Sequence, residues 1–179
     1  MIYDISQEIF SGVCYSGDIR PEFVRVREIA KGEDSNATEF RMNAHNATHI
    51  DAPYHRSDDG KTIDMLSPDT FFGECEVILF SNKARIKATD AKRILFADCD
   101  QIDEETASLL VDKGVVFVGA EGLSIGNAKV HEILLGNDVV VLEGARLGNV
   151  PEGKYLMCAA PINLGGSDGA PCRALLMTI

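Results

Sequence analysis

Residues 45–55 read HNATHIDAPYH and hold three of the four histidines of the chain. A helix is disfavoured here because Ile50 is β-branched and Pro53 excludes the residue before it from the α region. In an extended segment the side chains of His49 and Asp51 point to one face, while Ile50 points the other way, into a core. We therefore interpret this stretch as an extended segment that presents an imidazole and a carboxylate side by side.

Clustered histidines with a carboxylate favour a metal site. His45 would join the pair from the preceding turn, and two imidazoles with one carboxylate suit zinc, manganese or iron. A lone histidine is usually an ordinary core or surface residue, but three clustered with an Asp reverse those odds. Further along, His131 precedes Glu143, which ends the apolar run 139–142. Glu143 is either a solvated strand end or an inward ligand, and His131 alone has an ordinary place on a helix.

The remaining pattern predicts a mixed α/β fold with more strand than helix. The apolar run 75–80 predicts a strand covered on both faces, and the alternation in 23–29 a half-buried strand. Asp103 begins a helix that ends near Gly114. Several neighbouring strands lack an intervening helix, which argues against a regular doubly wound sheet. Further strands are expected at 2–6, 38–43, 115–119, 138–143, 155–162 and 174–177, and a short helix at 129–135.

Length and composition indicate one globular domain over residues 1–179. The 28 acidic residues exceed the 17 basic ones, and a net charge of −11 disfavours nucleic acid and anionic membranes as partners. Five scattered cysteines without a CxxC pair are typical of reduced thiols. Neither a signal peptide nor a membrane-spanning apolar run is visible. We expect a soluble cytoplasmic protein.

The chain resembles a known family. HNATHIDAPYH is similar to the HxGTHxDAPxH signature of the cyclase family of metal-dependent hydrolases, whose best-known members are bacterial kynurenine formamidases. Residues 15–18, 131–144 and 166–174 resemble further motifs of that family, in the same order. The resemblance implies a single domain of the swivelling β/β/α type, with a mixed, partly barrel-like sheet. It also implies a homodimer or homotetramer.

By this resemblance five residues match metal ligands. His45, His49 and Asp51 match the ligands of a first divalent ion. Asp51 also matches a carboxylate that bridges to a second ion, which His131 and Glu143 would complete. The resemblance thus implies one or two divalent ions, and zinc and manganese suit the ligand set alike.

Other positions carry further expectations. His55 matches the histidine that serves as acid and base, and Tyr15 matches an aromatic residue that lines the substrate pocket. Ala47 stands where the signature has Gly, so it is strained if that position requires a positive φ. Residues 120–129 match the family less closely and are expected to help form the pocket. In the last loop Asp168 and Arg173 are expected to pair with each other, although either could line the site.

These features lead to the hypothesis of a metal-dependent hydrolase of an amide-type C–N bond. The ion would lower the pKa of a bound water from 15.7 towards about 7, and His55 would carry its proton to the leaving nitrogen. An aryl formamide such as N-formylkynurenine is the favoured substrate, and a cyclic amide such as isatin, or a lactone, is the alternative. From other classes, a non-haem iron oxygenase and a non-catalytic metal-binding module are the competing interpretations.

Overall fold

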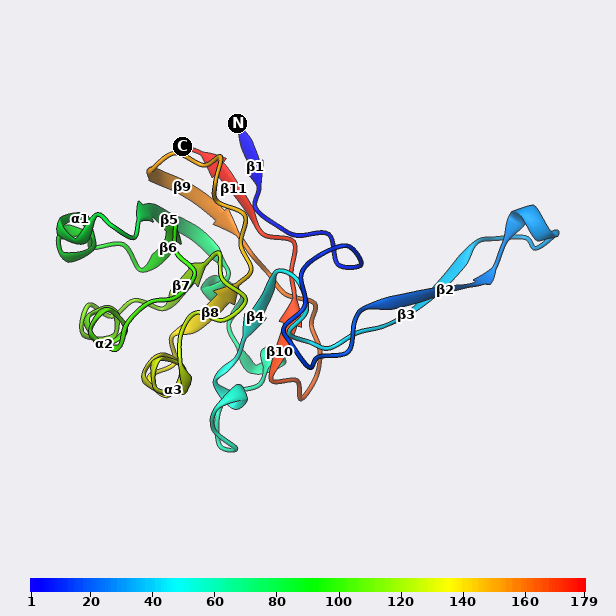
Figure 1. Ribbon diagram of the computed structural model, residues 1–179, viewed down its shortest axis with the longest axis horizontal. Helices are drawn as coiled ribbons and strands as arrows, with labels where there is room; N and C mark the ends of the chain where they lie inside the picture. Colours follow the sequence, from blue (N-terminus) through cyan, green and yellow to red (C-terminus); the bar gives the residue numbers. More distant parts are fainter.

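A nine-stranded mixed sheet forms the body of the protein, and the computed structural model describes residues 1–179. Three helices, α1 (Lys83–Ala88), α2 (Glu104–Asp112) and α3 (Ala128–Leu135), pack against this sheet (Figure 1). The sheet curls into a half-barrel, which confirms the expected mixed α/β fold. In spatial order its strands are β1 (Ile2–Asp4), β11 (Leu175–Thr178), β9 (Gly153–Cys158), β5 (Phe72–Leu79), β6 (Arg93–Ala97), β7 (Phe117–Ala120), β8 (Val140–Glu143), β4 (His49–Asp51) and β10 (Gly169–Pro171).

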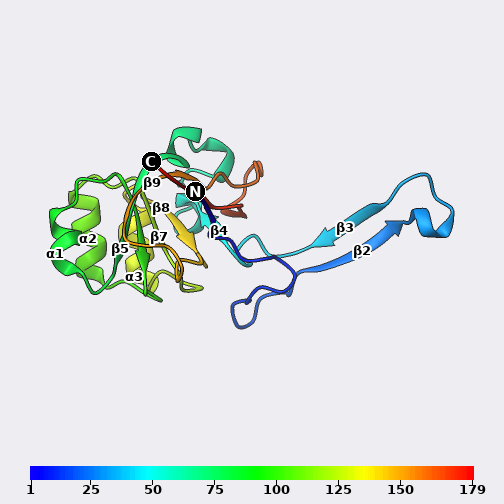
Figure 2. The ribbon, with the colours of Figure 1, turned by 90° about the horizontal axis from the view of Figure 1, so that it is seen from above.

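The centre of the sheet is wound from parallel strands. β5, β6, β7 and β8 pair in parallel, and α1, α2 and α3 connect them in turn. The sequence predictions missed β6 and α1. Helix α1 has six residues and one buried side chain, Ile86, so it is too short to give a periodic signal. The sheet as a whole is still not doubly wound, since the helices lie on one face and the outer strands are antiparallel (Figure 2).

Side chains of the central strands alternate between two cores. Along β8, Val141 packs in the cluster of the helices with Phe96 and Leu134, whereas Val140 and Leu142 pack in the cluster on the other face of the sheet. β5 divides its side chains in the same way, as its continuous apolar run predicted. Both faces of β8 are therefore buried up to its last residue.

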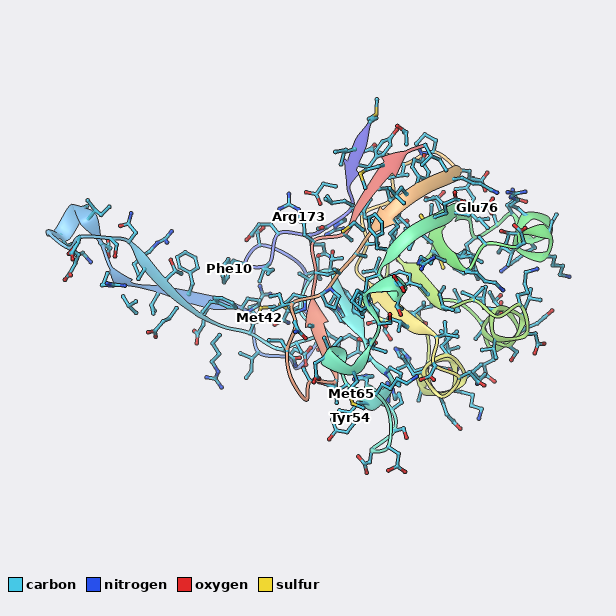
Figure 3. The ribbon with its side chains drawn as sticks, turned by 180° about the vertical axis from the view of Figure 1, so that it is seen from behind. Phe10, Met42, Tyr54, Met65, Glu76 and Arg173 are labelled. Carbon is cyan, nitrogen blue, oxygen red and sulfur yellow. The ribbon has the colours of Figure 1, made fainter.

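A two-stranded arm leaves the body and projects into open space (Figure 2). β2 (Glu22–Arg27) pairs with β3 (Ala37–Arg41), and neither strand pairs with the main sheet. The predicted half-buried strand is wrong for the single chain, because every residue of β2 is exposed. An alternating pattern shows that a strand has one row of apolar side chains, but it does not show what covers that row. In Figure 3 the side chains of the arm stand clear of the body, and Phe10 and Met42 mark its base.

The start of α2 and the free cysteines agree with the sequence predictions. Asp103 caps α2, since its side chain accepts a hydrogen bond from the backbone N–H of Thr106 at 2.7 Å. The five cysteines are free, and Cys75 and Cys99 are buried. None of the helices has the length and apolar character that crossing a bilayer requires, and the longest, α2, has nine residues.

Candidate metal centre

The candidate site is assembled where β4 lies beside β8. In this antiparallel pairing His49 lies opposite Glu143. Residues directly opposite each other project to the same face, and Asp51, two residues along β4, joins them there. All three side chains are buried. Glu143 is therefore an inward-facing carboxylate and not a solvated strand end.

The backbone holds His49 in one tautomer. Its Nδ1 lies 3.0 Å from the carbonyl oxygen of Ala47, which can only accept, so Nδ1 carries the proton. In the neutral ring Nε2 therefore carries a lone pair, and this buried atom has no hydrogen-bond partner. It faces Asp51 Oδ1 at 3.3 Å and Glu143 Oε2 at 3.4 Å. A buried lone pair directed at two anionic oxygens is unfavourable unless a cation or a proton lies among them.

α3 supplies a second imidazole in the same manner. His131 Nδ1 donates to the carbonyl oxygen of Asn127, one helical turn earlier, at 3.0 Å. Its Nε2 lies 3.0 Å from Glu143 Oε1 and 3.7 Å from Asp51 Oδ2. The backbone N–H of Ile125 also donates to Glu143 Oε1, at 2.7 Å. The loop before α3 therefore orients the Glu143 carboxylate.

His45 completes the group from the turn before β4. Its Nδ1 lies 2.8 Å from Asp51 Oδ1. The candidate ligand atoms of His45, His49 and Asp51 lie within 4.8 Å of one another, and the same holds for Asp51, His131 and Glu143. Asp51 belongs to both sets. The structure thus brings together the five residues expected as ligands, in the two sets that the family resemblance implied.

The electrostatics of this centre suit a divalent cation. Burial would lower the pKa of His49, but the carboxylates of Asp51 and Glu143 outweigh it and raise the pKa to about 10. Burial opposes the charged form of Asp51 too, yet His45 and His49 hold the pKa of that carboxyl well below its usual range. Without a metal, the neighbouring carboxylates therefore stabilise the protonated, positively charged form of His49. A divalent cation can replace that proton, and imidazole nitrogen with carboxylate oxygen is a ligand set of zinc and manganese.

A pocket of about 320 Å³ opens beside the centre. Tyr15 and Leu123 line it, together with all the candidate ligands except His49. His55 lines it as well, from the 3-10 turn Pro53–His55. The ring of His55 lies 4.4 Å from that of His45 between centroids, and it belongs to neither of the two sets that share Asp51. The structure therefore brings Tyr15 and His55, the other two predicted site residues, to the same pocket.

Asp168 lies at the site, a place that the sequence left open for it beside the favoured pairing with Arg173. The predicted pair of Asp168 and Arg173 is wrong, because Arg173 pairs with Asp4 while Asp168 Oδ2 lies 2.8 Å from His45 Nε2. The two residues flank β10 and so face different neighbours, and β10 itself pairs with the ligand strand β4. The available signal was an acidic residue inside a motif that resembles the family's closing motif.

Comparison with known proteins identifies the family. The family described as putative cyclase matches residues 3–101. The chain belongs to this cyclase family. A curated relative, the kynurenine formamidase of Erythrobacter litoralis, is 30% identical over 200 residues, which covers 98% of this chain and 93% of the relative. Because that alignment is longer than the 179 residues of this chain, the chain carries deletions relative to the formamidase.

Solved structures of the cyclase fold match along the whole chain. One, described as a potential metal-dependent hydrolase with cyclase activity, has a TM-score of 0.81 at 29% identity and covers 98% of this chain and 96% of its own. The isatin hydrolase A of Labrenzia aggregata has a TM-score of 0.84 at 17% identity, over 99% of this chain and 93% of its own. At that identity the second likeness shows the fold alone.

Proposed function

We propose that this cyclase-family protein is a metal-dependent hydrolase that cleaves an amide-type C–N bond. The observation that carries the proposal is the buried Nε2 of His49, which faces the carboxylates of Asp51 and Glu143 without a hydrogen-bond partner. This arrangement fits a divalent cation, and a pocket large enough for a small molecule opens beside it.

The proposed ligands are His45, His49 and Asp51 for one ion, and Asp51, His131 and Glu143 for a second. When bound, a divalent ion such as zinc or manganese acidifies water and stabilises negative charge on a carbonyl oxygen. A non-haem iron oxygenase needs only two histidines and one carboxylate, so the second set favours the hydrolase over that alternative.

His55 is the proposed acid and base. Its Nδ1 lies 3.1 Å from Asp168 Oδ2, which leaves Nε2 to take a proton from water and to return it to the leaving nitrogen. A histidine in this position favours an enzyme over a non-catalytic metal-binding module, because mere binding gives His55 no role. Tyr15 is proposed to contact the substrate from the pocket wall.

We propose an aryl formamide as the substrate class, with N-formylkynurenine as the first compound to test. The relative at 30% identity is a kynurenine formamidase, and about 320 Å³ accommodates one small aromatic amide. Isatin is the second candidate, because it carries the same kind of C–N bond in a ring fused to an aromatic one. The deletions relative to the formamidase make this second test necessary.

Formate release from N-formylkynurenine tests the proposal. Chelator-treated protein should be inactive, and added zinc or manganese should restore turnover. The variant His55→Ala should keep its metal and lose about 100-fold or more in kcat. Asp51→Asn should lose metal as well as turnover, since Asp51 belongs to both ligand sets. Asp58→Asn, in an exposed turn, is the control and should behave as wild type.

Two results would overturn the proposal. Absence of bound metal after incubation with zinc and manganese would show that the proposed residues do not form a metal centre. Bound metal without turnover of either N-formylkynurenine or isatin would reject the proposed substrates. Loss of metal in His55→Ala would instead make His55 a ligand.

We also propose that the arm docks on a second copy of this chain to form a homodimer or homotetramer. An isolated two-stranded hairpin is at best marginally stable in water, and this arm exposes Phe23, Val24 and Phe40 at 46%, 58% and 58%. The arm, residues 22–41, is also nearly neutral, with four basic and five acidic residues, whereas the whole chain carries −11, so it can approach an acidic copy with little repulsion. The basic residues of the arm are Arg25, Arg27, Lys31 and Arg41, and the acidic ones are Glu22, Glu28, Glu33, Asp34 and Glu39.

Residues 1–179 are proposed to act as one domain. The pocket takes Tyr15 and His55 from the segment that matches the family and Leu123 and Glu143 from beyond it. The five free cysteines support a reducing, cytoplasmic compartment.

A further inference from the structure

One carboxylate oxygen joins two histidines of different proposed roles. Asp168 Oδ2 lies 2.8 Å from Nε2 of His45, a proposed ligand, and 3.1 Å from Nδ1 of His55, the proposed acid and base. The two rings lie 4.4 Å apart between centroids. A carboxylate that accepts from an imidazole fixes which ring nitrogen carries the proton. Asp168 is thus able to set the tautomer of both rings at once.

The backbone around Asp168 is held firmly, although its side chain is partly exposed. Its carbonyl oxygen accepts from the backbone N–H of Ala52 at 2.9 Å, and the carbonyl of Ser167 accepts from Ile63 at 2.9 Å. The next residue, Gly169, begins β10 and pairs with Asp51 on the ligand strand. The Asp168 carboxylate is therefore attached to a backbone that is held in place next to the proposed ligands.

The same strand approaches His45 so closely that no side chain fits at position 169. A Cβ on Gly169 would lie 2.6 Å from His45 Cε1 and 2.9 Å from the carbonyl oxygen of Ile50. This close approach brings Asp168 within hydrogen-bonding distance of His45. The contact is therefore part of the packing of β10 against the site.

We propose that Asp168 is the positioning residue that holds His55 and His45 in their working tautomers through this one oxygen. The proposal rests on the function proposed above. With Nδ1–H of His55 donated to Asp168, Nε2 is the atom that exchanges protons at the reacting water. With Nε2–H of His45 donated to the same oxygen, Nδ1, which faces Asp51, is the nitrogen with the lone pair.

Two other roles for Asp168 make different predictions. A structural role would show only in stability. A ligand role is possible in principle because His45, His55 and Asp168 also form a set whose candidate atoms lie within 4.8 Å. The experiment must therefore report tautomer, metal affinity and turnover separately.

The test compares Asp168→Asn with Asp64→Asn in the zinc-loaded full chain. Asp64 accepts from the backbone N–H of Gly166 at 2.9 Å, so it supports the same loop and contacts no histidine. Nitrogen-15 NMR of the histidine rings reads the tautomers directly, and four histidines make a simple spectrum. Zinc affinity and steady-state kinetics on N-formylkynurenine complete the set.

For Asp168→Asn we expect mixed tautomers for His55, zinc affinity weakened about tenfold, and kcat lowered about 10- to 100-fold with KM within about twofold. In a His55→Ala background, at saturating zinc, Asp168→Asn should lower the remaining kcat by less than about twofold. Asp168→Glu, which restores the charge, should recover part of kcat. Asp64→Asn should match wild type in all three readouts.

Unchanged His55 ring signals together with wild-type kcat in Asp168→Asn would overturn the proposal. Abolished zinc binding with the His55 tautomer intact would overturn it too, in favour of a ligand role. If Asp168→Asn does not fold, Asp168→Glu decides on the same readouts, and wild-type kcat with an unchanged tautomer there counts against positioning. If wild-type protein turns over no formamide, the proposed function fails, while the tautomer and zinc measurements still judge Asp168.

Discussion

The carbonyl oxygen of Ala47 accepts the Nδ1 hydrogen of His49 at 3.0 Å, and Ala47 reaches this position with a φ of +58°. The left-handed region costs a residue with a Cβ about 1–2 kcal/mol. Ala47 occupies the place of the glycine in the signature that the sequence resembles. The proposed ligand His49 is therefore oriented by a backbone that carries strain.

Ala47→Gly should raise the free energy of unfolding by about 1 kcal/mol, because glycine adopts a positive φ without steric cost. Zinc affinity should not change, since the hydrogen bond to His49 comes from the backbone. Urea denaturation of chelator-treated protein measures the first quantity. Ala47→Val is the matched opposite and should destabilise the protein, because a β-branched residue fits this region worst. A loss of stability in Ala47→Gly would show that Ala47 is not strained.

Protein stripped of metal should lose stability as the pH rises from about 6.5 to about 10. The pKa of His49 is raised from 6.5 to about 10 by Asp51 and Glu143 against the opposing effect of burial. The folded protein thus keeps a proton that the unfolded chain releases above pH 6.5, so this stabilisation is complete below pH 6.5 and is lost as the pH rises through 10.

The metal-loaded protein should lack this decline from His49, because the cation takes the place of the proton. Thermal unfolding of both forms at about pH 6, 8 and 9.5 tests the difference. Parallel pH dependence of the two melting temperatures would speak against a cation at His49.

Gly169→Ala should weaken metal binding about tenfold and lower the free energy of unfolding by about 1–3 kcal/mol. The added Cβ would lie 2.6 Å from His45 Cε1, so either the ring or β10 has to move. Gly165→Ala is the control, because nothing lies within 4 Å of a Cβ at that position. Zinc titration and urea denaturation give the two quantities. Wild-type zinc affinity in Gly169→Ala would mean that His45 can move without loss.

Phe40→Glu should weaken self-association at least about tenfold, because it puts a charge into the apolar part of the arm that is proposed to be buried. Phe40 lies opposite Phe23 in the arm and is 58% exposed in the single chain. Met65→Glu, at a residue that is 64% exposed on the body, should leave the assembly intact. Sedimentation velocity measures both variants, and a monomeric wild-type protein at micromolar concentration would refute the docking of the arm.

Local sequence was enough to predict part of the site. The spacing of His49 and Asp51 places both side chains on one face of any extended segment, whatever lies around it. The helix that begins at Asp103 and the strand that ends at Glu143 follow from a capping residue and an apolar run. The approach of His131 and Glu143 to the ligands in residues 45–51 was expected only from the family resemblance, since the two segments are more than 70 residues apart in sequence.

Tertiary structure alone decided what depends on partners far along the chain. The alternation in β2 would be the same whether its apolar row faced the body or the solvent. The structure shows that it faces solvent, because β2 pairs only with β3 and all its residues are exposed. Asp168 and Arg173 are near neighbours in sequence, yet β10 directs one to His45 and the other to Asp4. Local pattern determines the direction of a side chain relative to its own strand. The register between strands determines which residue it meets, and that register is set by burial of both cores together.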